Sequence, residues 1–337
     1  MIIVVDAMGG DNAPYDIVKG CIDATNEQEG FDILLLGDSQ KIEKILKDNK
    51  FNSSRISLRN TTEVITNDDI PTKAIKTKKD SSMVVGFNIL KHNKGDVFIS
   101  AGNTGALMAG STLILGRISG IDRPALAPVI PTKKGGALLI DAGFNTICKP
   151  INYLQFGIMG SIYMKEIFKI DRPKIGLINV GSEEIKGNEI IRQAYSLLSE
   201  SGLNFLGNIE GRGIPEGEVD VAVCDGFVGN VLLKFLEGVG SFIFEGLKDV
   251  YYRNTISKLS SFLVKGDLKK FKKRLDYEEY GGVPVLGING TVFKCHGNSN
   301  AKSFKKSMIK AYFFAKSTIM EQIKHEISRM EVGNVGV

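Results

Sequence analysis

Short apolar runs rich in valine, isoleucine and leucine alternate with longer amphipathic stretches along almost the whole chain. The runs that we read as strands are 2–6, 32–37, 55–59, 96–100, 125–130, 136–141, 174–180, 219–224 and 291–295. The stretches that we read as helices are 14–27, 39–49, 81–93, 104–117, 150–168, 187–201, 228–252 and 300–326. Near-continuous apolar strands separated by helices are typical of parallel sheets that are buried on both faces. The sequence therefore predicts an α/β fold with a mainly parallel sheet covered by helices on both faces.

The chain contains no Pro/Ser-rich linker, internal repeat or low-complexity tract. Its 337 residues and 43% hydrophobic content suit a large buried core. We therefore predict a single α/β domain over residues 1–337, with residues 253–280 as an insertion. The N-terminal MIIVVDAMGGD lacks the basic segment and long apolar core of a signal peptide, so we read it as the first strand. Charged residues interrupt 228–252, and we expect no membrane-spanning helix.

The insertion carries two successive helical patterns in place of the strand–helix alternation. Its apolar positions are Ile256, Leu259 and Leu263 on one face, and Leu268, Phe271 and Leu275 on another. Basic residues between 265 and 274 are opposed only by Asp267. These patterns predict an amphipathic helical hairpin that projects from the α/β body.

Charge and cysteine content exclude several classes of protein. The formal net charge of +5 is mild and no nucleic-acid-binding motif is present, so we expect no nucleic-acid partner, although acidic partners are favoured. The four cysteines are far apart and form no CxxC pair. A disulfide framework or zinc site is therefore not expected, and the reducing cytoplasm is the natural compartment.

Four predicted strands end in clusters of small and polar residues. The clusters are DAMGGD at 6–11, SAGNTGA at 100–106, VGSEEIKGNE at 180–189 and DGFVGN at 225–230. In open parallel sheets, ligands bind beyond the carboxyl ends of the strands, and glycine lets the backbone approach an anion. Such a turn can also be a simple tight connection, but four of them favour a phosphate-binding site.

The SAGNTGA turn is the strongest phosphate-binding candidate, because it follows a strand and supplies Asn103 and Thr104 as donors. No GxGxxG after the first strand, P-loop or GxSxG motif is present, which disfavours nucleotide-binding and serine hydrolase classes. Cys224 precedes Asp225, which would raise the pKa of its thiol, so we favour inert packing over nucleophilic catalysis. His296 lies between a strand and the last helix and suits either a site histidine or a turn hydrogen bond.

Taken together, the motifs VDAMGGDNAP, ISAGNTGALM, GRISGIDRPALAP, NVGSEEIKGNE, CDGFVGNVLLK and YGGVPVLGINGTVFKCHGNS give the chain a family resemblance. It resembles the bacterial phosphate acyltransferases of phospholipid synthesis, which move an acyl group from acyl carrier protein to phosphate. The resemblance covers nearly the whole length. It implies a fold related to isocitrate dehydrogenase and phosphate acetyltransferase, a homodimer, and a membrane-embedded glycerol-3-phosphate acyltransferase that consumes the product.

The chain departs from the family pattern in two places. Asn12 stands where the family commonly has histidine, so that imidazole is not essential here. In the loop that begins at Gly143, the aspartate and the acidic residue that usually flank the lysine and proline are missing. Asn145 and Lys149 are among the residues that can still be carried over from that loop.

The residues and the resemblance together predict a site with three groups of residues. We expect phosphate to be bound by Gly9, Gly10, Gly102, Asn103, Thr104 and Gly105. The catalytic candidates are Lys186, which the resemblance favours most, and then Asn188 and His296. The supporting polar residues are Asp6, Asp11, Asn145, Lys149, Asp225 and Asn230. Because phosphate is itself the nucleophile, we expect no serine or cysteine nucleophile. We also expect no metal and no cofactor.

The hairpin suggests where such an enzyme works. Its apolar faces suit an acyl chain or the membrane interface, and its lysines suit anionic lipid or acidic acyl carrier protein. A dimer contact is the simpler alternative. We therefore expect a cytoplasmic protein attached peripherally to the membrane.

Three alternatives stay open at this point. One is a short-chain phosphate acyltransferase that uses acyl-CoA, and another is a dehydrogenase of the isocitrate dehydrogenase type. The third is a non-catalytic membrane scaffold for lipid synthesis. The apolar hairpin favours long acyl chains, and neither a nicotinamide site nor clustered aspartates for a metal are visible in the sequence.

Overall fold

The computed structural model describes residues 1–51, 53–253, 264, 266–268, 271 and 281–334, and it divides the strands between two sheets. The first sheet has seven strands in the order β3-β2-β1-β4-β12-β11-β5. They are β1 (Ile2–Asp6), β2 (Asp32–Gly37), β3 (Ile56–Asn60), β4 (Val97–Ser100), β5 (Ala125–Leu126), β11 (Val283–Leu286) and β12 (Thr291–Lys294). The pairs from β3 to β12 are parallel, and β11 is antiparallel to both of its neighbours.

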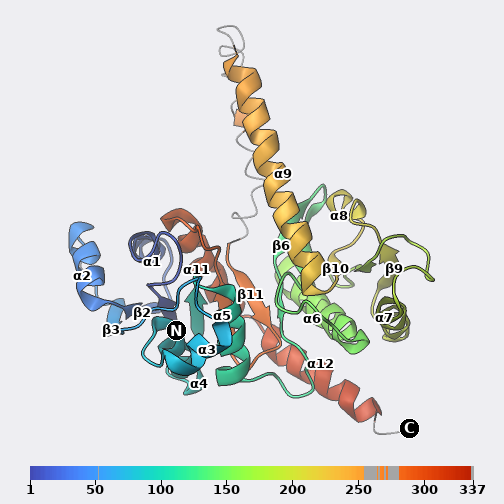
Figure 1. The fold of residues 1–337 in the computed structure, drawn as a ribbon, viewed down its shortest axis with the longest axis horizontal. Coiled ribbons are helices and arrows are strands. Elements are labelled where there is room, and N and C mark those ends of the chain that lie inside the picture. The colour runs from blue at the N-terminus through green and yellow to red at the C-terminus, as the bar shows by residue number, and fades with distance from the viewer. Residues whose placement is uncertain (52, 254–263, 265, 269–270, 272–280, 335–337) are drawn as a thin grey trace.

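The second sheet has five strands in the order β6-β7-β10-β8-β9. They are β6 (Val129–Thr132), β7 (Gly135–Ile140), β8 (Ile175–Ile178), β9 (Phe205–Ile209) and β10 (Val221–Val223). Only the β6–β7 pair among them is antiparallel. The predicted α/β class and the mainly parallel pairing are confirmed, with two sheets in place of one (Figure 1).

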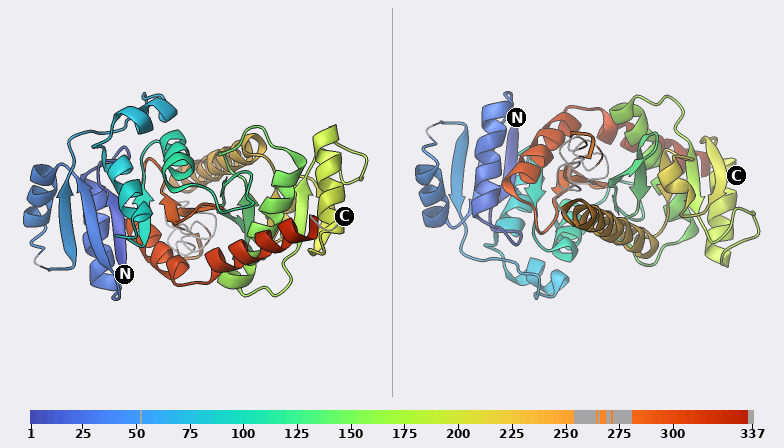
Figure 2. Two further views of the ribbon diagram at one scale, coloured as in Figure 1. Left: turned by 90° about the horizontal axis from the view of Figure 1, so that it is seen from below. Right: turned by 90° about the horizontal axis from the view of Figure 1, so that it is seen from above.

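Helices cover both faces of each sheet (Figure 2). Those of the first sheet are α1 (Tyr15–Glu27), α2 (Ser39–Asp48), α3 (Pro71–Thr77), α4 (Ser82–Lys91), α5 (Thr104–Gly110, continued by a π-helical turn at Ser111–Leu115) and α11 (Ala301–Ala315). Those of the second are α6 (Pro150–Phe168), α7 (Glu189–Glu200), α8 (Gly213–Glu216), α9 (Gly226–Tyr252) and α12 (Ile319–Asn334). Alternate residues of β1 face opposite layers: Ile3 and Val5 pack in the core that contains α1 and α11, and Val4 packs in the core that contains α4.

The structure also corrects several element boundaries. The predicted strand 125–130 is two strands, one in each sheet, and the predicted helix 300–326 is divided into α11 and α12. This division lets α12 pass from the first sheet to pack against α6 of the second. The elements α3, α8, β9 and β11 were not predicted.

Helix α9 leaves the second sheet and projects far from the body (Figure 1). Gly226 and Gly229 at its first turn are its buried residues, while Phe235 and Phe242 are 66% and 75% exposed. By length and composition it is the one described helix that could cross a membrane, with a mean hydropathy of 1.5. Length and composition therefore do not support the expectation of no such helix, because Lys234 and Glu237 are the only charges in residues 226–243.

The predicted hairpin can be followed only in part. Ile256, Leu259, Leu263 and Leu275 lie outside the described residues. Leu268 and Phe271 are helical, and the Phe271 ring lies 5.9 Å from the Phe244 ring of α9, centroid to centroid. Phe271 therefore packs against α9.

Candidate active site

Three turns meet at the carboxyl edge of the first sheet. Strands β1, β4 and β12 are neighbours and run parallel, so the turns that follow them share one edge. The backbone N–H of Asp11 donates to the carbonyl of Gly297 over 2.8 Å. A Cβ added to Gly9 would lie 2.7 Å from the backbone nitrogen of Gly102, which only glycine permits. The structure thus brings the predicted Gly9–Gly10 and Gly102 turns together and adds the turn that contains Gly297.

Asp6 lies beneath these turns. Its buried carboxylate accepts hydrogen bonds from the hydroxyls of Ser82 (2.5 Å) and Ser100 (2.7 Å). Ser100 Oγ in turn accepts from the backbone N–H of Gly102. Burial raises the pKa of Asp6, while the serine hydrogen bonds lower it. Asp6 therefore fixes the shape of the glycine turns from below.

Asn103 and Thr104 have different positions in the SAGNTGA turn. Asn103 Oδ1 accepts from the backbone N–H of Ala106, and its Nδ2 donates to the carbonyl of Thr66 over 3.0 Å. Both ends of this amide therefore have partners within the chain. Thr104 and Gly105, by contrast, line a cavity between the two sheets.

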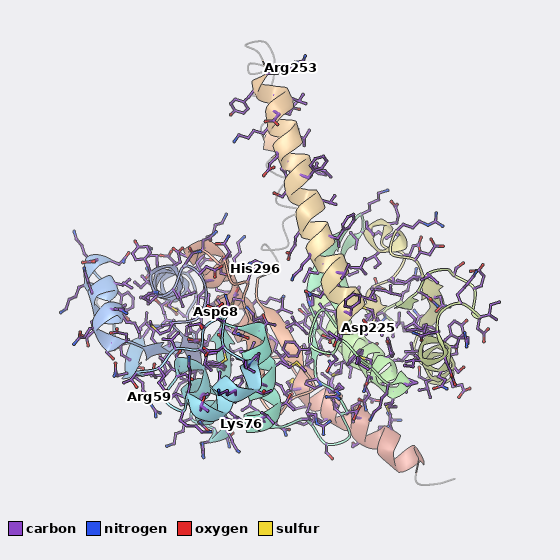
Figure 3. The ribbon with its side chains drawn as sticks, viewed as in Figure 1. Arg59, Asp68, Lys76, Asp225, Arg253 and His296 are labelled. Atoms are coloured by element: carbon purple, nitrogen blue, oxygen red, sulfur yellow. The ribbon has the colours of Figure 1, made fainter. Side chains whose placement is uncertain are left out.

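That cavity, which we call the central cavity, has a volume of about 370 Å³. Its polar lining residues include Thr104, Asn230, Lys234, Glu237, Lys294, His296, Ser299, Ser303 and Ser307. Its apolar lining residues include Met108, Leu126, Pro128, Val129, Ala142, Leu233 and Val283. Figure 3 shows His296 on the first-sheet side of this region, and Asp225 at the base of α9 on the opposite side. The lining of the central cavity therefore combines polar and apolar side chains.

Lys294, the last residue of β12, was not predicted to be a site residue. It lines the central cavity although the whole residue is only 8% exposed. Its Nζ donates to the carbonyl of Ala101, over 3.3 Å, and to that of Cys295. Burial lowers the pKa of Lys294 to about 8. One weak signal was available in the sequence: a lysine at the end of an apolar strand, directly before the Cys295–His296 turn.

The second sheet contributes a loop held by Asp141, which was also not predicted. This buried carboxylate follows β7 and accepts from the backbone N–H groups of Leu126 (2.9 Å) and Asn145 (2.7 Å). Burial raises its pKa to about 6. The predicted residue Asn145 donates from Nδ2 to Asp141 and to the carbonyl of Pro124, so it supports the loop. Asn230 of α9 lines the central cavity beside Gly143 of this loop.

Two predicted catalytic residues lie outside the lining of the central cavity. Lys186 is in the exposed loop after β8, with its Nζ 3.9 Å from Glu183 Oε1. Strand β10 separates β8 from β7, whose following loop does line the cavity. Asn188 Oδ1 accepts from the backbone N–H of Ile191 and caps α7.

Three predicted supporting residues serve the fold around the cavity. Asp225 caps α9 by accepting from the backbone N–H of Val228, and it also accepts from the hydroxyl of Tyr153. Lys149 is exposed, 3.6 Å from a carboxylate oxygen of Asp122. Asp11 lies close to Gly297. None of these side chains is in the lining of the central cavity as far as the structure describes it.

The remaining reactive side chains fit a site without a protein nucleophile. Cys224 is buried, and desolvation raises the pKa of its thiol well above its ordinary value, in line with inert packing. His296 lines the central cavity, and its Nδ1 accepts from the backbone N–H of Asn298 over 3.3 Å. Among the described residues, no group of three or more His, Cys, Asp or Glu could hold a metal ion. The arrangement can bind an anion next to an apolar chain.

Comparisons with known proteins agree with this chemistry. Residues 1–322 match the model of a family described as fatty acid synthesis protein. The chain is 57% identical to a phosphate acyltransferase of Acetivibrio thermocellus, with 99% of each chain covered. It is 48% identical to a phosphate acyltransferase of Thermoanaerobacter pseudethanolicus, with 98% of each covered.

Solved structures share the fold at much lower sequence identity. A phosphotransacetylase from Streptococcus pyogenes superposes with a TM-score of 0.62 at 16% identity, covering 94% of each chain. A branched-chain phosphotransacylase from Enterococcus faecalis gives a TM-score of 0.56 at 11% identity, covering 94% of this chain and 99% of the other. At such identities the likeness concerns the fold alone.

Proposed function

Because the chain belongs to the fatty acid synthesis protein family and is a phosphate acyltransferase, we propose that it makes acyl phosphate from acyl carrier protein and inorganic phosphate. The acyl group is a long-chain fatty acyl group, and the product serves phospholipid synthesis. The observation that carries this proposal is the central cavity, whose lining combines glycines and polar side chains with apolar side chains. The polar residues suit phosphate, and the apolar residues suit a fatty acyl chain.

The reaction needs no nucleophile from the protein. A phosphate oxygen attacks the thioester carbonyl carbon and forms a C–O bond. Collapse of the tetrahedral intermediate breaks the C–S bond, and the departing thiolate takes up a proton. The enzyme must therefore hold the phosphate in line with the carbonyl and stabilise the developing oxyanion.

In this proposal, phosphate occupies the polar end of the central cavity. Thr104 offers a hydroxyl donor there, and Gly105 and Gly297 let an anion approach the backbone. Gly9 and Gly10 lie behind, packed against the neighbouring turns, and shape the cradle without touching the ligand. His296, at the same end, is the proposed proton donor to the thiolate.

The acyl chain occupies the apolar wall. Met108, Leu126 and Val129 line it from the β-strands and α5, and Leu233 lines it from α9. A volume of about 370 Å³ is within the usual range of small-molecule sites. Since α9 continues outward with exposed apolar residues, a long chain can extend along it beyond the central cavity.

Lys186 is the residue through which we propose that the second sheet contributes to catalysis. Its ammonium lies at the carboxyl end of β8 and is only loosely paired with Glu183. We place it on the donor side, where it stabilises the oxyanion if the exposed loop after β8 moves toward the central cavity when the acyl thioester binds. Asn188 supports this loop by capping α7.

Helix α9 supports a peripheral attachment to the cytoplasmic membrane surface. Its exposed phenylalanines at 235 and 242 present apolar area that the described body does not cover. We further propose a homodimer, and docking of the acidic acyl carrier protein near the basic residues 265–274. A membrane-embedded glycerol-3-phosphate acyltransferase would consume the acyl phosphate.

Product analysis tests the reaction. The purified chain is mixed with phosphate and palmitoyl acyl carrier protein, or with acetyl-CoA, and the products are identified by mass spectrometry. We expect palmitoyl phosphate from the first donor and much less acetyl phosphate from the second. A preference for acetyl-CoA would favour a short-chain enzyme, and no product from either donor would favour a scaffold.

Liposome flotation tests the attachment. Wild type and a Phe235→Glu, Phe242→Glu double variant are mixed with anionic vesicles, and the oligomeric state is measured in parallel. We expect the double variant to lose vesicle binding. Unchanged flotation by a folded double variant would contradict attachment through this face of α9.

A further inference from the structure

We propose that the ammonium group of Lys294 binds the phosphate substrate directly and is its main source of positive charge in the central cavity. This inference rests on the proposed function, because it takes the polar end of the central cavity as the phosphate site. It names a binding residue that lies outside the glycine turns.

The position of Lys294 is the first argument. It is the last residue of β12, at the point where the turns after β1, β4 and β12 meet. Its Nζ reaches the carbonyl of Ala101, in the turn that continues to Thr104 and Gly105. All three of Thr104, Gly105 and Lys294 line the central cavity. The ammonium is therefore within the same cradle as the glycine backbone.

The partners of Lys294 are the second argument. An ammonium group has three N–H donors, and here two of them go to the neutral carbonyls of Ala101 and Cys295. Among the described residues no carboxylate lies within ion-pair distance of Lys294. Asp6, which is held by the hydroxyls of Ser82 and Ser100, and Asp11 are near enough to raise its pKa but do not contact its ammonium. A buried ammonium without a direct ion pair is costly, and a phosphate dianion in the central cavity would supply one.

The second lysine that lines the cavity, among the residues that the structure describes, is less suited to this role. Lys234 is exposed on α9, and Glu237 lies one helical turn further along the same helix. Solvent screens such a charge, so it contributes little to binding a small anion. Lys294 is buried among the glycine turns, where the attraction between unlike charges is stronger.

Lys310 of α11 provides a matched control. Its Nζ is also buried, has no hydrogen-bond partner, and its pKa is lowered by burial to about 8. It does not line the central cavity. Two lysines therefore share burial and a lowered pKa, and only one of them faces the proposed phosphate site.

The experiment compares Lys294→Met, Lys294→Arg and Lys310→Met with wild type. Binding of inorganic phosphate is measured by isothermal titration calorimetry, and KM values for phosphate and for the acyl donor by steady-state kinetics. We expect Lys294→Met to weaken phosphate binding and raise the phosphate KM by about tenfold to a hundredfold, as for a lost charge-assisted hydrogen bond. The donor KM should change by less than about twofold, since that substrate is bound elsewhere. Lys294→Arg should recover part of the loss, and Lys310→Met should change neither constant.

Wild-type phosphate affinity in a folded Lys294→Met variant, or an equal loss in Lys310→Met, would overturn the inference. If Lys294→Met does not fold, Lys294→Gln is measured in its place, since its amide can still donate to the carbonyl of Ala101. The test separates this inference from the proposed function. If phosphate binding depends on Lys294 but no acyl group is transferred from acyl carrier protein, the inference stands and only the proposed function is wrong.

Discussion

The two sheets each place one buried aspartate at the carboxyl end of a central strand, and each uses it differently. Asp6 of the first sheet is held by two serine hydroxyls, and it supports turns that pack tightly on one another. Asp141 of the second sheet is held mainly by backbone N–H groups, and it shapes a single loop. In both sheets the carboxylate lies beneath the site and not in it.

The difference lies in what each sheet presents to the central cavity. The first sheet presents interlocked turns and the buried ammonium of Lys294. The second presents the loop at Gly143 and the base of α9, while its lysine at 186 stays in an exposed loop. We interpret the first sheet as a preformed anion site and the second as the side that receives the acyl donor.

The largest expected effect comes from Lys186→Ala, which tests whether the second sheet takes part in the chemistry. Turnover should fall by about tenfold to a thousandfold, the range seen when one oxyanion-stabilising group is removed. The phosphate KM should change little. Lys174→Ala is the control, because Lys174 is exposed next to the opposite end of the same strand, β8. Wild-type turnover in a folded Lys186→Ala enzyme would contradict a catalytic role for Lys186, and the catalytic residues would then lie on the first sheet.

A smaller effect is expected from the pH dependence of stability through Asp141. Because its folded-state pKa is raised to about 6, the folded state binds the proton more tightly than the unfolded state, whose pKa is near 3.8. Its stabilising contribution is complete below pH 4 and is lost as pH rises to about 6, a change of about 3 kcal/mol in the free energy of unfolding.

Urea unfolding of wild type and Asp141→Asn across this range measures that change. As the pH rises, the free energy of unfolding of wild type should fall relative to that of Asp141→Asn. Asp6→Asn should give a shift of the same sign, because burial raises the pKa of Asp6 as well. A difference that does not vary with pH would show that the buried carboxyl at 141 does not titrate in this range.

Gly9→Ala tests the interlocked turns of the first sheet. The added Cβ would meet Asp6 Oδ2 at 2.5 Å and the Gly102 nitrogen at 2.7 Å. We expect destabilisation of about 1–3 kcal/mol and weaker phosphate binding, since overpacking displaces the turns. Gly238→Ala in α9 is the control: its Cβ would meet nothing within 4 Å, and it should stabilise the protein by about 0.5–1 kcal/mol. Equal effects of the two substitutions on stability would contradict the tight packing.

The smallest effect on stability is expected in the outer part of α9. Phe242→Ser should change the free energy of unfolding by less than about 0.5 kcal/mol, because the side chain is largely exposed. Phe98→Ser is the comparison, because Phe98 is fully buried in β4, and it should lower the free energy of unfolding by several kcal/mol. A large destabilisation by Phe242→Ser would indicate that α9 is packed in solution, which thermal unfolding of both variants would detect.

Much of the fold and part of the site could be predicted from the sequence. The strand and helix runs follow from local periodicity, and the turns at Gly9, Gly102 and Thr104 follow from glycine and polar residues at strand ends. The sequence could not show that the side-chain amide of Asn103 forms its hydrogen bonds within the chain. It also could not show that Lys186 lies outside the lining of the central cavity. Those outcomes depend on which side chains become neighbours.

The amino-acid sequence by itself determined the α/β class, the glycine turns and the family, because these are carried by local pattern and by motifs. Only the tertiary structure decided that the strands form two sheets, that Asp141 is buried, and that Lys294 joins the cradle. Lys294 and Ala101 are 193 residues apart in the chain, and they meet because β12 pairs with β4. Burial and electrostatics are set by such long-range neighbours, so a lysine that looks ordinary in the sequence becomes the buried charge of the site.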